Sequence, residues 1–421
     1  MAREARMSIK PWVSATCVTA LMAMSGATGA AQWTASWGAA PLPPTPAMGP
    51  FPATPAFSNQ TIRQVVRITA GGGRIRIRFT NEFGSKPLVI GAARVALADA
   101  KGVIVPGTDR ALSFAGQPTA LIPAGSPFLS DPIDFPTKPL AYIAISTYLP
   151  EDTGPCTCHA VGLQTAYVSD TGNFVAGEFA PKQTNSARAF ISGVAVYSTV
   201  PAKTVAVLGD SISDGVGSTP DSNRRWPDLF AERLAARHGH QTLGVVNMGI
   251  SGNRMLNDGA GQSALARFDR DVLSLPGVAY VIIFEGVNDL GISFGQFHGP
   301  FAEVFKSLVP QSKSTAERMI AGYQQLINRA HGRGLKVFGA TIAPYEGADY
   351  YSPEGEAVRQ RINAWIRSGG AFDAVLDFDA ALRDPNRPTQ IAAPLQSGDH
   401  LHGSDLGYEA IAKSINLTLF D

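Results

Sequence analysis

After Pro201 the chain alternates short apolar runs with longer amphipathic stretches, and this alternation strongly limits the folds that it can adopt. The apolar runs lie at 204–208, 243–248, 278–284, 336–343 and 374–378. The stretches with helical periodicity lie at about 225–239, 263–273, 314–333, 354–368 and 405–419. Runs that are apolar on both faces are typical of strands in a parallel sheet that helices cover on both sides. The pattern therefore predicts a three-layer α/β/α domain over residues 200–421.

Residues 32–199 have the pattern of β structure instead. Residues 74–79 alternate arginine with isoleucine or phenylalanine, which places one face on a core and the other in solvent. A similar run at 61–68 precedes it across Gly71-Gly72-Gly73, a link that predicts a hairpin. Further short runs follow at 87–97, 140–148 and 187–198. We expect an all-β sandwich or jelly-roll-like domain, with the proline-rich segment 41–55 as an extended surface arm.

Residues 1–31 have the composition of a targeting segment. Three basic residues (Arg3, Arg6 and Lys10) precede an apolar stretch at 12–24, and small residues follow up to Ala31. This order is typical of a cleaved secretory signal peptide, and the apolar stretch is shorter than the ~20 residues that a membrane span needs. We therefore expect a secreted or periplasmic protein that is not inserted in a membrane after cleavage near Ala30 or Ala31.

Charge and cysteine content limit the classes of partner. The net charge is +1 and no long run of one sign occurs, which argues against a nucleic-acid partner. Cys17 lies in the predicted signal peptide, which leaves Cys156 and Cys158 directly before His159. A zinc site of this type would need a second cysteine pair, so a metal is not expected. A tight loop disulfide and two free thiols both remain open.

Polar motifs follow three of the predicted parallel strands. Gly209-Asp210-Ser211 follows the first strand, a segment that ends in Gly252-Asn253 follows the second, and Gly286-Val287-Asn288-Asp289 follows the third. Carboxyl ends of parallel strands meet at one edge of the sheet, where ligands of open α/β sheets bind. Asp399-x-x-His402 comes just before the last helical stretch. Serine is a weak nucleophile alone and needs a base, usually a histidine held by a carboxylate.

These four motifs resemble those of the SGNH, or GDSL-type, hydrolases, a family of serine esterases, lipases and carbohydrate acetylesterases. The resemblance covers about 201–421 and implies a flavodoxin-like fold without cofactor or metal. It implies Ser211 as the nucleophile, His402 as the base and Asp399 as its acid partner. It also implies an oxyanion hole formed by the backbone N–H groups of Ser211 and Gly252 and the side-chain amide of Asn288. Two positions depart from the family pattern without removing a catalytic group: Ile212 replaces a leucine, and Gly403 replaces a proline.

Several polar residues near these motifs could have either of two roles. His400 also lies near Asp399, but the spacing favours His402 as the base. Asp210 and Asp289 are expected to accept hydrogen bonds behind the site. Asp214, Asn247 and Arg254 are expected either to line the cleft or to hold loops. The run Arg224-Arg225-Trp226 is expected either to grip a polar substrate or to start a helix with charged surface residues. The other histidines are expected to be surface or structural residues: His159, His238, His240, His298 and His331.

The order of an exported β domain followed by this hydrolase domain resembles bacterial two-domain esterases. We expect hydrolysis of short-chain, acetyl-type esters through an acyl-enzyme, with acetylated carbohydrate as the foremost substrate. A general aryl or short-chain lipolytic esterase, an O-acyltransferase and a non-catalytic carbohydrate-binding protein are the alternatives. The β domain could bind carbohydrate, cover the active site or only support the fold. Substrate-binding residues and oligomeric state are not predicted.

Overall fold

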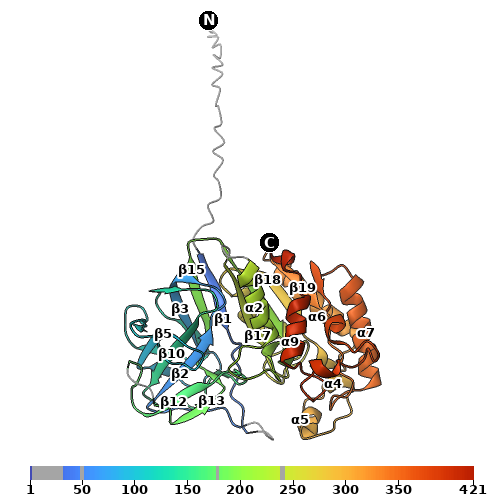
Figure 1. Ribbon diagram of the computed structural model, residues 1–421, viewed down its shortest axis with the longest axis horizontal. Helices are drawn as coiled ribbons and strands as arrows, with labels where there is room; N and C mark the ends of the chain where they lie inside the picture. The colour runs from blue at the N-terminus through green and yellow to red at the C-terminus, as the bar shows by residue number, and fades with distance from the viewer. Residues whose placement is uncertain (2–31, 48–51, 177–179, 238–241) are drawn as a thin grey trace.

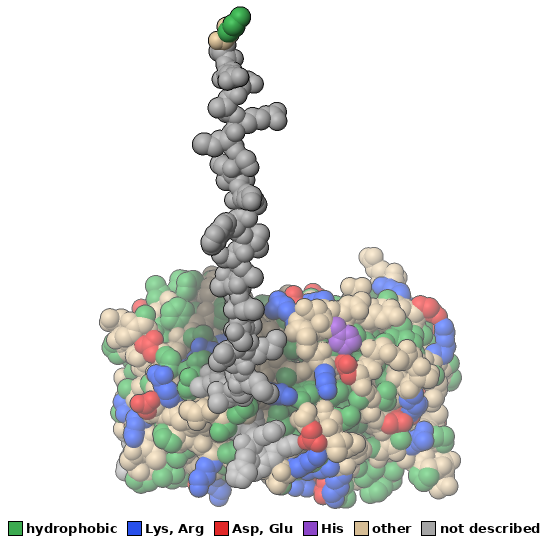
Figure 2. All heavy atoms as spheres, turned by 90° about the horizontal axis from the view of Figure 1, so that it is seen from above, with side chains coloured by type: hydrophobic (Ala, Val, Ile, Leu, Met, Phe, Trp, Pro, Cys, Tyr) green, Lys and Arg blue, Asp and Glu red, His purple; other side chains and the backbone are tan. Residues whose placement is uncertain are grey.

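The computed structural model describes residues 1, 32–47, 52–176, 180–237 and 242–421, which form two domains that lie side by side (Figure 1). The predicted signal peptide falls almost wholly on residues 2–31, outside the described residues, as do 48–51 of the predicted arm and the histidines at 238 and 240. Among the described residues, every helix is too short or too polar to cross a membrane. Acidic, basic and apolar side chains are interspersed over the coloured part of the face in Figure 2.

The N-terminal domain consists mostly of two antiparallel sheets. The first contains β1 (Gln32–Gly38), β15 (Ile191–Ser198), β3 (Gly72–Asn81), β8 (Ser126–Leu129) and β9 (Ile133–Thr137). The second contains β13 (Gln183–Asn185), β12 (Ala166–Thr171), β2 (Gln60–Arg67), β10 (Tyr142–Leu149), β5 (Ala92–Ala98) and β6 (Arg110–Ala111). Two short pairs complete it: β4 (Leu88–Ile90) with β7 (Ala120–Ile122), and β11 (Cys158–His159) with β14 (Arg188–Ala189). Alternating apolar residues of both sheets form one buried core, as the predicted sandwich requires.

The predicted hairpin between 61–68 and 74–79 is wrong. Strand β2 pairs with β10 and β12, whereas β3 pairs with β15, β8 and β9, so the glycine link carries the chain from one sheet to the other. The residues just before the glycines are buried: Thr69 Oγ1 contacts the carbonyl of Ser36 at 2.7 Å and, in the second domain, that of Val245 at 3.0 Å. A Cβ at Gly71 would lie 2.6 Å from the Thr137 carbonyl oxygen, so glycine lets the chain turn tightly at this corner.

The second domain is built on a parallel sheet with the strand order β17-β16-β18-β19-β20. Its strands are β16 (Ala202–Gly209), β17 (Thr242–Gly249), β18 (Val278–Phe284), β19 (Lys336–Ala340) and β20 (Ala374–Leu376). In chain order this is 2-1-3-4-5, the flavodoxin-like arrangement. Ligands of such sheets bind beyond the carboxyl ends of the strands, where the strand order reverses around β16.

Helices cover this sheet, which confirms the predicted three-layer domain. The helices are α1 (Ser211–Asp214), α2 (Trp226–Arg237), α3 (Ala264–Phe268), the π-helical turn η1 (Asp269–Leu273), α4 (Val287–Phe294), α5 (Ala302–Ser307), α6 (Ala316–His331), α7 (Pro353–Ser368), α8 (Phe378–Leu382), α9 (Asp405–Ser414) and two 3₁₀ turns, η2 (Ala393–Leu395) and η3 (Leu417–Phe420). Helices α2 and α9 lie side by side (Figure 1), and α6 packs on α7. The short helices α1, α4, α5 and α8 were not predicted, because so few residues show no clear helical period.

The two domains meet along β1, a strand that the sequence analysis did not predict. Strand β1 pairs with β15 inside the sandwich and also packs against β17 of the second domain. Ala35 N–H donates to the Pro276 carbonyl (2.8 Å), and Thr204 Oγ1 contacts the Ala35 carbonyl (3.1 Å). A buried apolar cluster crosses the junction and contains Ala35, Ala40, Val246, Met248 and Ile250. The sandwich is therefore joined to the α/β domain through buried contacts, not through a linker alone.

Candidate active site

Ser211 begins the short helix α1 directly after β16, at the carboxyl edge of the sheet. Asp210 caps this helix, since its Oδ1 accepts a hydrogen bond from the Ile212 N–H at 2.9 Å. The turn from strand to helix places Ser211 where the strand order reverses. Ser211 is only 5% exposed, so other protein groups surround most of its side chain.

The side chains of Ser211, His402 and Asp399 form one hydrogen-bonded chain. His402 Nε2 lies 2.7 Å from Ser211 Oγ, and His402 Nδ1 lies 2.5 Å from Asp399 Oδ2. Because a carboxylate only accepts, Nδ1 carries the proton, which leaves the Nε2 lone pair to accept the serine hydroxyl. The ring of His400 lies against Gly347 instead. The structure therefore places His402, and not His400, between the serine and the carboxylate.

Asp399 is held in place by its own loop. Its Oδ1 accepts hydrogen bonds from the backbone N–H groups of Leu401 (3.0 Å) and His402 (2.9 Å). Partial burial raises the pKa of Asp399, but the hydrogen bonds and the charge of His402 outweigh it and hold the pKa below its usual range. Asp399 is therefore ionised throughout the neutral range, as an orienting carboxylate must be.

The two other residues expected in the oxyanion hole follow the strands that neighbour β16, Gly252 after β17 and Asn288 after β18. Gly252 has a φ of +79°, a left-handed conformation that favours glycine, and a Cβ there would lie 2.9 Å from that of Ala260. Asn288, in α4, donates one amide hydrogen from Nδ2 to the Asn253 carbonyl (3.0 Å), and its Oδ1 accepts from the Tyr350 hydroxyl (3.1 Å). An amide has two N–H bonds, so one remains for a ligand. The first N–H groups of a helix also have no acceptor within it, which includes that of Ser211.

Buried charged residues brace the loops behind the site. Arg267 is fully buried and donates to the carbonyls of Gly209 (3.0 Å) and Met248 (2.6 Å) and to Asn253 Oδ1 (2.9 Å). It thus ties the ends of β16 and β17 to the turn that carries Gly252. Asp210 and Asp289 accept backbone N–H bonds, in keeping with the acceptor role expected of them. Arg254 Nη1 donates to the Leu308 carbonyl and Asn247 Nδ2 to that of Ser213, so both hold loops.

Sequence reasoning assigned no role to three of the residues around the site. Tyr350 and Arg267 reach it from distant segments, and no local motif marks the contacts that they make. Glu285 is buried, and its carboxyl group has no hydrogen-bond partner among the described residues. Burial raises its pKa well above the usual value and so favours the neutral form of the group. A glutamate that continues the apolar run 278–284 is the signal that could have drawn attention to it.

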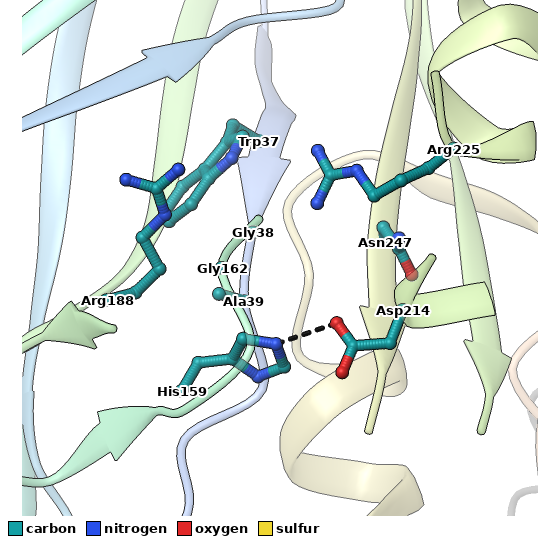
Figure 3. Close-up of a pocket in the computed structure, with 9 residues that line it drawn as sticks. All are labelled: Trp37, Gly38, Ala39, His159, Gly162, Arg188, Asp214, Arg225 and Asn247. Carbon is teal, nitrogen blue, oxygen red and sulfur yellow. Dashed lines mark hydrogen bonds and ion pairs between the residues drawn. The ribbon is translucent and has the colours of Figure 1, made fainter. Parts of the chain in front are cut away.

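A small pocket lies at the domain junction, close to α1 (Figure 3). It is lined by Trp37, Gly38, Ala39, His159, Gly162 and Arg188 from the sandwich and by Asp214, Arg225 and Asn247 from the α/β domain. Arg225 forms a bidentate ion pair with Asp228 (2.6 and 3.0 Å) and Trp226 is buried, so this run starts helix α2. His159 is buried rather than on the surface, and a disulfide joins Cys156 to Cys158.

One family model matches the chain. Residues 207–410 match the sequence profile of the GDSL-like Lipase/Acylhydrolase family. The chain resembles the solved structure of a lipase/acylhydrolase from Enterococcus faecalis, with 20% sequence identity and a TM-score of 0.37 over 50% of this chain and 92% of the other. It also resembles a GDSL-like lipase from Bacteroides thetaiotaomicron, with 16% identity and a TM-score of 0.35 over 52% of this chain and 88% of the other. It also resembles a variant of an acetyl xylan esterase from Geobacillus stearothermophilus, with 20% sequence identity and a TM-score of 0.37. That match covers 50% of this chain and 92% of the other. No curated protein matches the chain.

Proposed function

We propose that the chain is a carboxylic ester hydrolase that works through an acyl-enzyme on Ser211, and the match of its α/β domain to the GDSL-like lipase/acylhydrolase family supports this. The observation that carries this proposal is the contact of His402 Nε2 with Ser211 Oγ at 2.7 Å, with Asp399 on the other ring nitrogen. An ester hydrolase needs an activated nucleophile, and this geometry supplies one.

In this mechanism Ser211 Oγ attacks the ester carbonyl carbon while His402 Nε2 removes its proton. The carbonyl oxygen becomes an oxyanion, which accepts hydrogen bonds from the N–H groups of Ser211 and Gly252 and from Asn288 Nδ2. His402 then protonates the departing alcohol, and the acyl group stays on Ser211 as an ester. Water, deprotonated by the same histidine, attacks that ester and releases the carboxylic acid. Asp399 stabilises the imidazolium in both halves of the reaction.

Replacing Asn288 by alanine is expected to lower kcat for p-nitrophenyl acetate by about 10²- to 10³-fold, with little change in KM. The amide stabilises charge that exists only in the transition state, so its loss spares ground-state binding. Steady-state kinetics on the purified variant provide the measurement. Asn386→Ala is the matched control, since this exposed asparagine lies outside the site. An Asn288→Ala variant with wild-type kcat would remove Asn288 from the oxyanion hole.

The proposed substrate is a short acyl ester, with acetyl groups on a carbohydrate as its foremost form. The site supports this because it opens to solvent beside the serine: the Asp399 side chain is 47% exposed. A second, mainly polar pocket of the domain junction lies nearby, lined by Leu163, Gln164, Ser218, Thr219, Asn223, Arg224 and Arg225. Thr219, which lines this pocket, contacts the segment after His402, because its Oγ1 donates a hydrogen bond to Asp405 Oδ2 (2.7 Å). Polar side chains of this kind suit a hydroxyl-rich alcohol.

A short-acyl site is expected to give kcat/KM values for p-nitrophenyl acetate about tenfold or more above those for p-nitrophenyl palmitate. A long acyl chain gains little binding energy at a site shaped for a short one. Comparable values for the two esters would contradict the short-acyl assignment. Acetate release from acetylated xylan, measured against the deacetylated polymer, tests the carbohydrate part. Release from the aryl ester alone would leave an esterase of simple esters, and acetyl transfer to an added sugar would indicate an O-acyltransferase.

We also propose that the protein is exported and that residues 1–31 are its signal peptide. The support is the order of basic, apolar and small residues in this segment. Expression of the whole chain in a bacterial host, followed by N-terminal sequencing of the exported protein, is the test. Cleavage near Ala30 or Ala31 is expected, whereas an uncleaved protein that stays in the cytoplasm would contradict export.

A further inference from the structure

We propose that His159 of the sandwich domain positions the oxyanion loop of the α/β domain, so that the β domain is part of the catalytic unit. This inference rests on the proposed function, because it assigns a purpose to the loop that carries Gly252. It makes His159 a positioning residue that acts through Asp214 and does not touch the substrate.

The first step is the contact between the two domains. His159 Nε2 lies 2.9 Å from Asp214 Oδ1 (Figure 3). His159 Nδ1 lies 3.0 Å from the Ala40 carbonyl oxygen. Both neighbours are acceptors, so both ring nitrogens carry a proton and the ring is an imidazolium. Burial lowers the pKa of His159, and the charge and hydrogen bonds of its partners, Asp214 foremost, outweigh burial and raise it. The junction therefore contains a buried ion pair whose side chains are 6% and 3% exposed.

The second step links this ion pair to the oxyanion loop. Asp214 Oδ2 accepts two hydrogen bonds from Ser251, one from its backbone N–H (3.0 Å) and one from its hydroxyl (2.7 Å). Ser251 directly precedes Gly252, whose N–H is assigned to the oxyanion hole. Asp214 also ends the helix that Ser211 begins. One carboxylate thus fixes the nucleophile helix against the oxyanion loop, and His159 fixes that carboxylate from the other domain.

The third step is the rigid mounting of His159 in the sandwich. The disulfide between Cys156 and Cys158 closes the loop directly before it. Strand β11 pairs with β14, and Leu42 N–H donates to the Cys158 carbonyl at 2.9 Å. A side chain that only filled space would not need to be fixed on both sides. A support for an oxyanion donor does, because a displacement of about 1 Å at a reacting centre costs on the order of 10²-fold in rate.

The test compares His159→Ala and His159→Gln with the wild-type full-length protein. Alanine removes the donor to Asp214, and we expect kcat for p-nitrophenyl acetate to fall about 10- to 10²-fold with KM within about twofold. Glutamine offers an amide N–H in place of Nε2–H, so it is expected to restore most of kcat. His331→Ala is the matched control, because His331 forms a similar but more exposed pair with Asp373 (2.8 Å) away from the site.

Ser251→Ala keeps the test decisive if the His159→Ala variant does not fold. It removes one hydrogen bond to Asp214, and we expect a smaller fall in kcat, again without a change in KM. The inference is overturned if His159→Ala or Ser251→Ala keeps wild-type kcat, if kcat falls equally in His331→Ala, or if glutamine and alanine at 159 give equal kcat. If Ser211→Ala abolishes the turnover of the wild type, the proposed function holds, and any of these results overturns only the role of His159. Turnover that survives Ser211→Ala overturns the proposed function together with this inference.

Discussion

Replacing Ser211 by alanine is expected to lower kcat for p-nitrophenyl acetate by on the order of 10⁴-fold or more. Alanine leaves no atom to attack the carbonyl, so the acyl-enzyme cannot form. His402 and the oxyanion donors remain, and they account for the small residual rate that such variants keep over the uncatalysed reaction. The side chain is small and sits at the start of a short helix, so the loss of one oxygen has little effect on packing.

The measurement is initial-rate kinetics on purified Ser211→Ala, with the thermal unfolding midpoint determined on the same sample. Ser368→Ala is the control, because this exposed serine ends helix α7 and lies outside the site. Wild-type kcat in Ser211→Ala would show that another residue is the nucleophile. A large fall in kcat together with early unfolding would point to loss of structure instead.

Replacing Asp399 by asparagine is expected to lower kcat by on the order of 10³- to 10⁴-fold. The wild-type carboxylate accepts a hydrogen bond from His402 Nδ1–H at 2.5 Å and so leaves the Nε2 lone pair facing Ser211. An asparagine can turn its N–H toward Nδ1, and the imidazole then carries its proton on Nε2, where it cannot accept the serine hydroxyl. KM should change little, since Asp399 does not contact the substrate in the proposed mechanism.

The pH dependence of this pair follows from the direction of its shift. The folded-state pKa of Asp399 lies below its unfolded value of about 3.9. Its stabilising contribution is therefore complete above that value and is lost only as the pH falls through the lower, folded-state pKa. Ionisation of Asp399 should consequently not limit the rate above about pH 4.

The control for Asp399→Asn is Asp170→Asn, which removes an exposed carboxylate paired with Lys182 (3.0 Å) in the sandwich. Equal kcat in Asp399→Asn and the wild type would rule out the orienting role.

The sheet and the approximate place of the site could be predicted because each follows from local patterns. Apolar runs separated by helical stretches specify parallel strands, and parallel strands bring their carboxyl ends to one edge. Ser211, Gly252 and Asn288 each follow a different strand, so all three are expected at the same edge of the sheet, whatever the conformation of the loops. His402 could be placed through its spacing from Asp399, which is short enough to act within one loop.

Contacts between distant segments could not be predicted in this way. The glycine link at 71–73 is typical of a hairpin, yet the two strands that it joins belong to different sheets of the sandwich and pair with strands distant in sequence. His159 follows a cysteine pair and has no motif of its own, and its partner Asp214 lies in the other domain. Tyr350 orients Asn288 from a loop that is distant in sequence. A single sequence contains no periodic signal for such contacts.

Covalent labelling of the nucleophile tests the central claim most directly. The wild-type protein is treated with diethyl p-nitrophenyl phosphate, and its mass and its esterase activity are followed together, with peptide mapping of the labelled product. A serine activated by His402 should acquire one diethylphosphoryl group, activity should fall in proportion to labelling, and the label should lie on Ser211. Proportional loss of activity with the label on another residue, or continued hydrolysis by a protein fully labelled at Ser211, would contradict the mechanism.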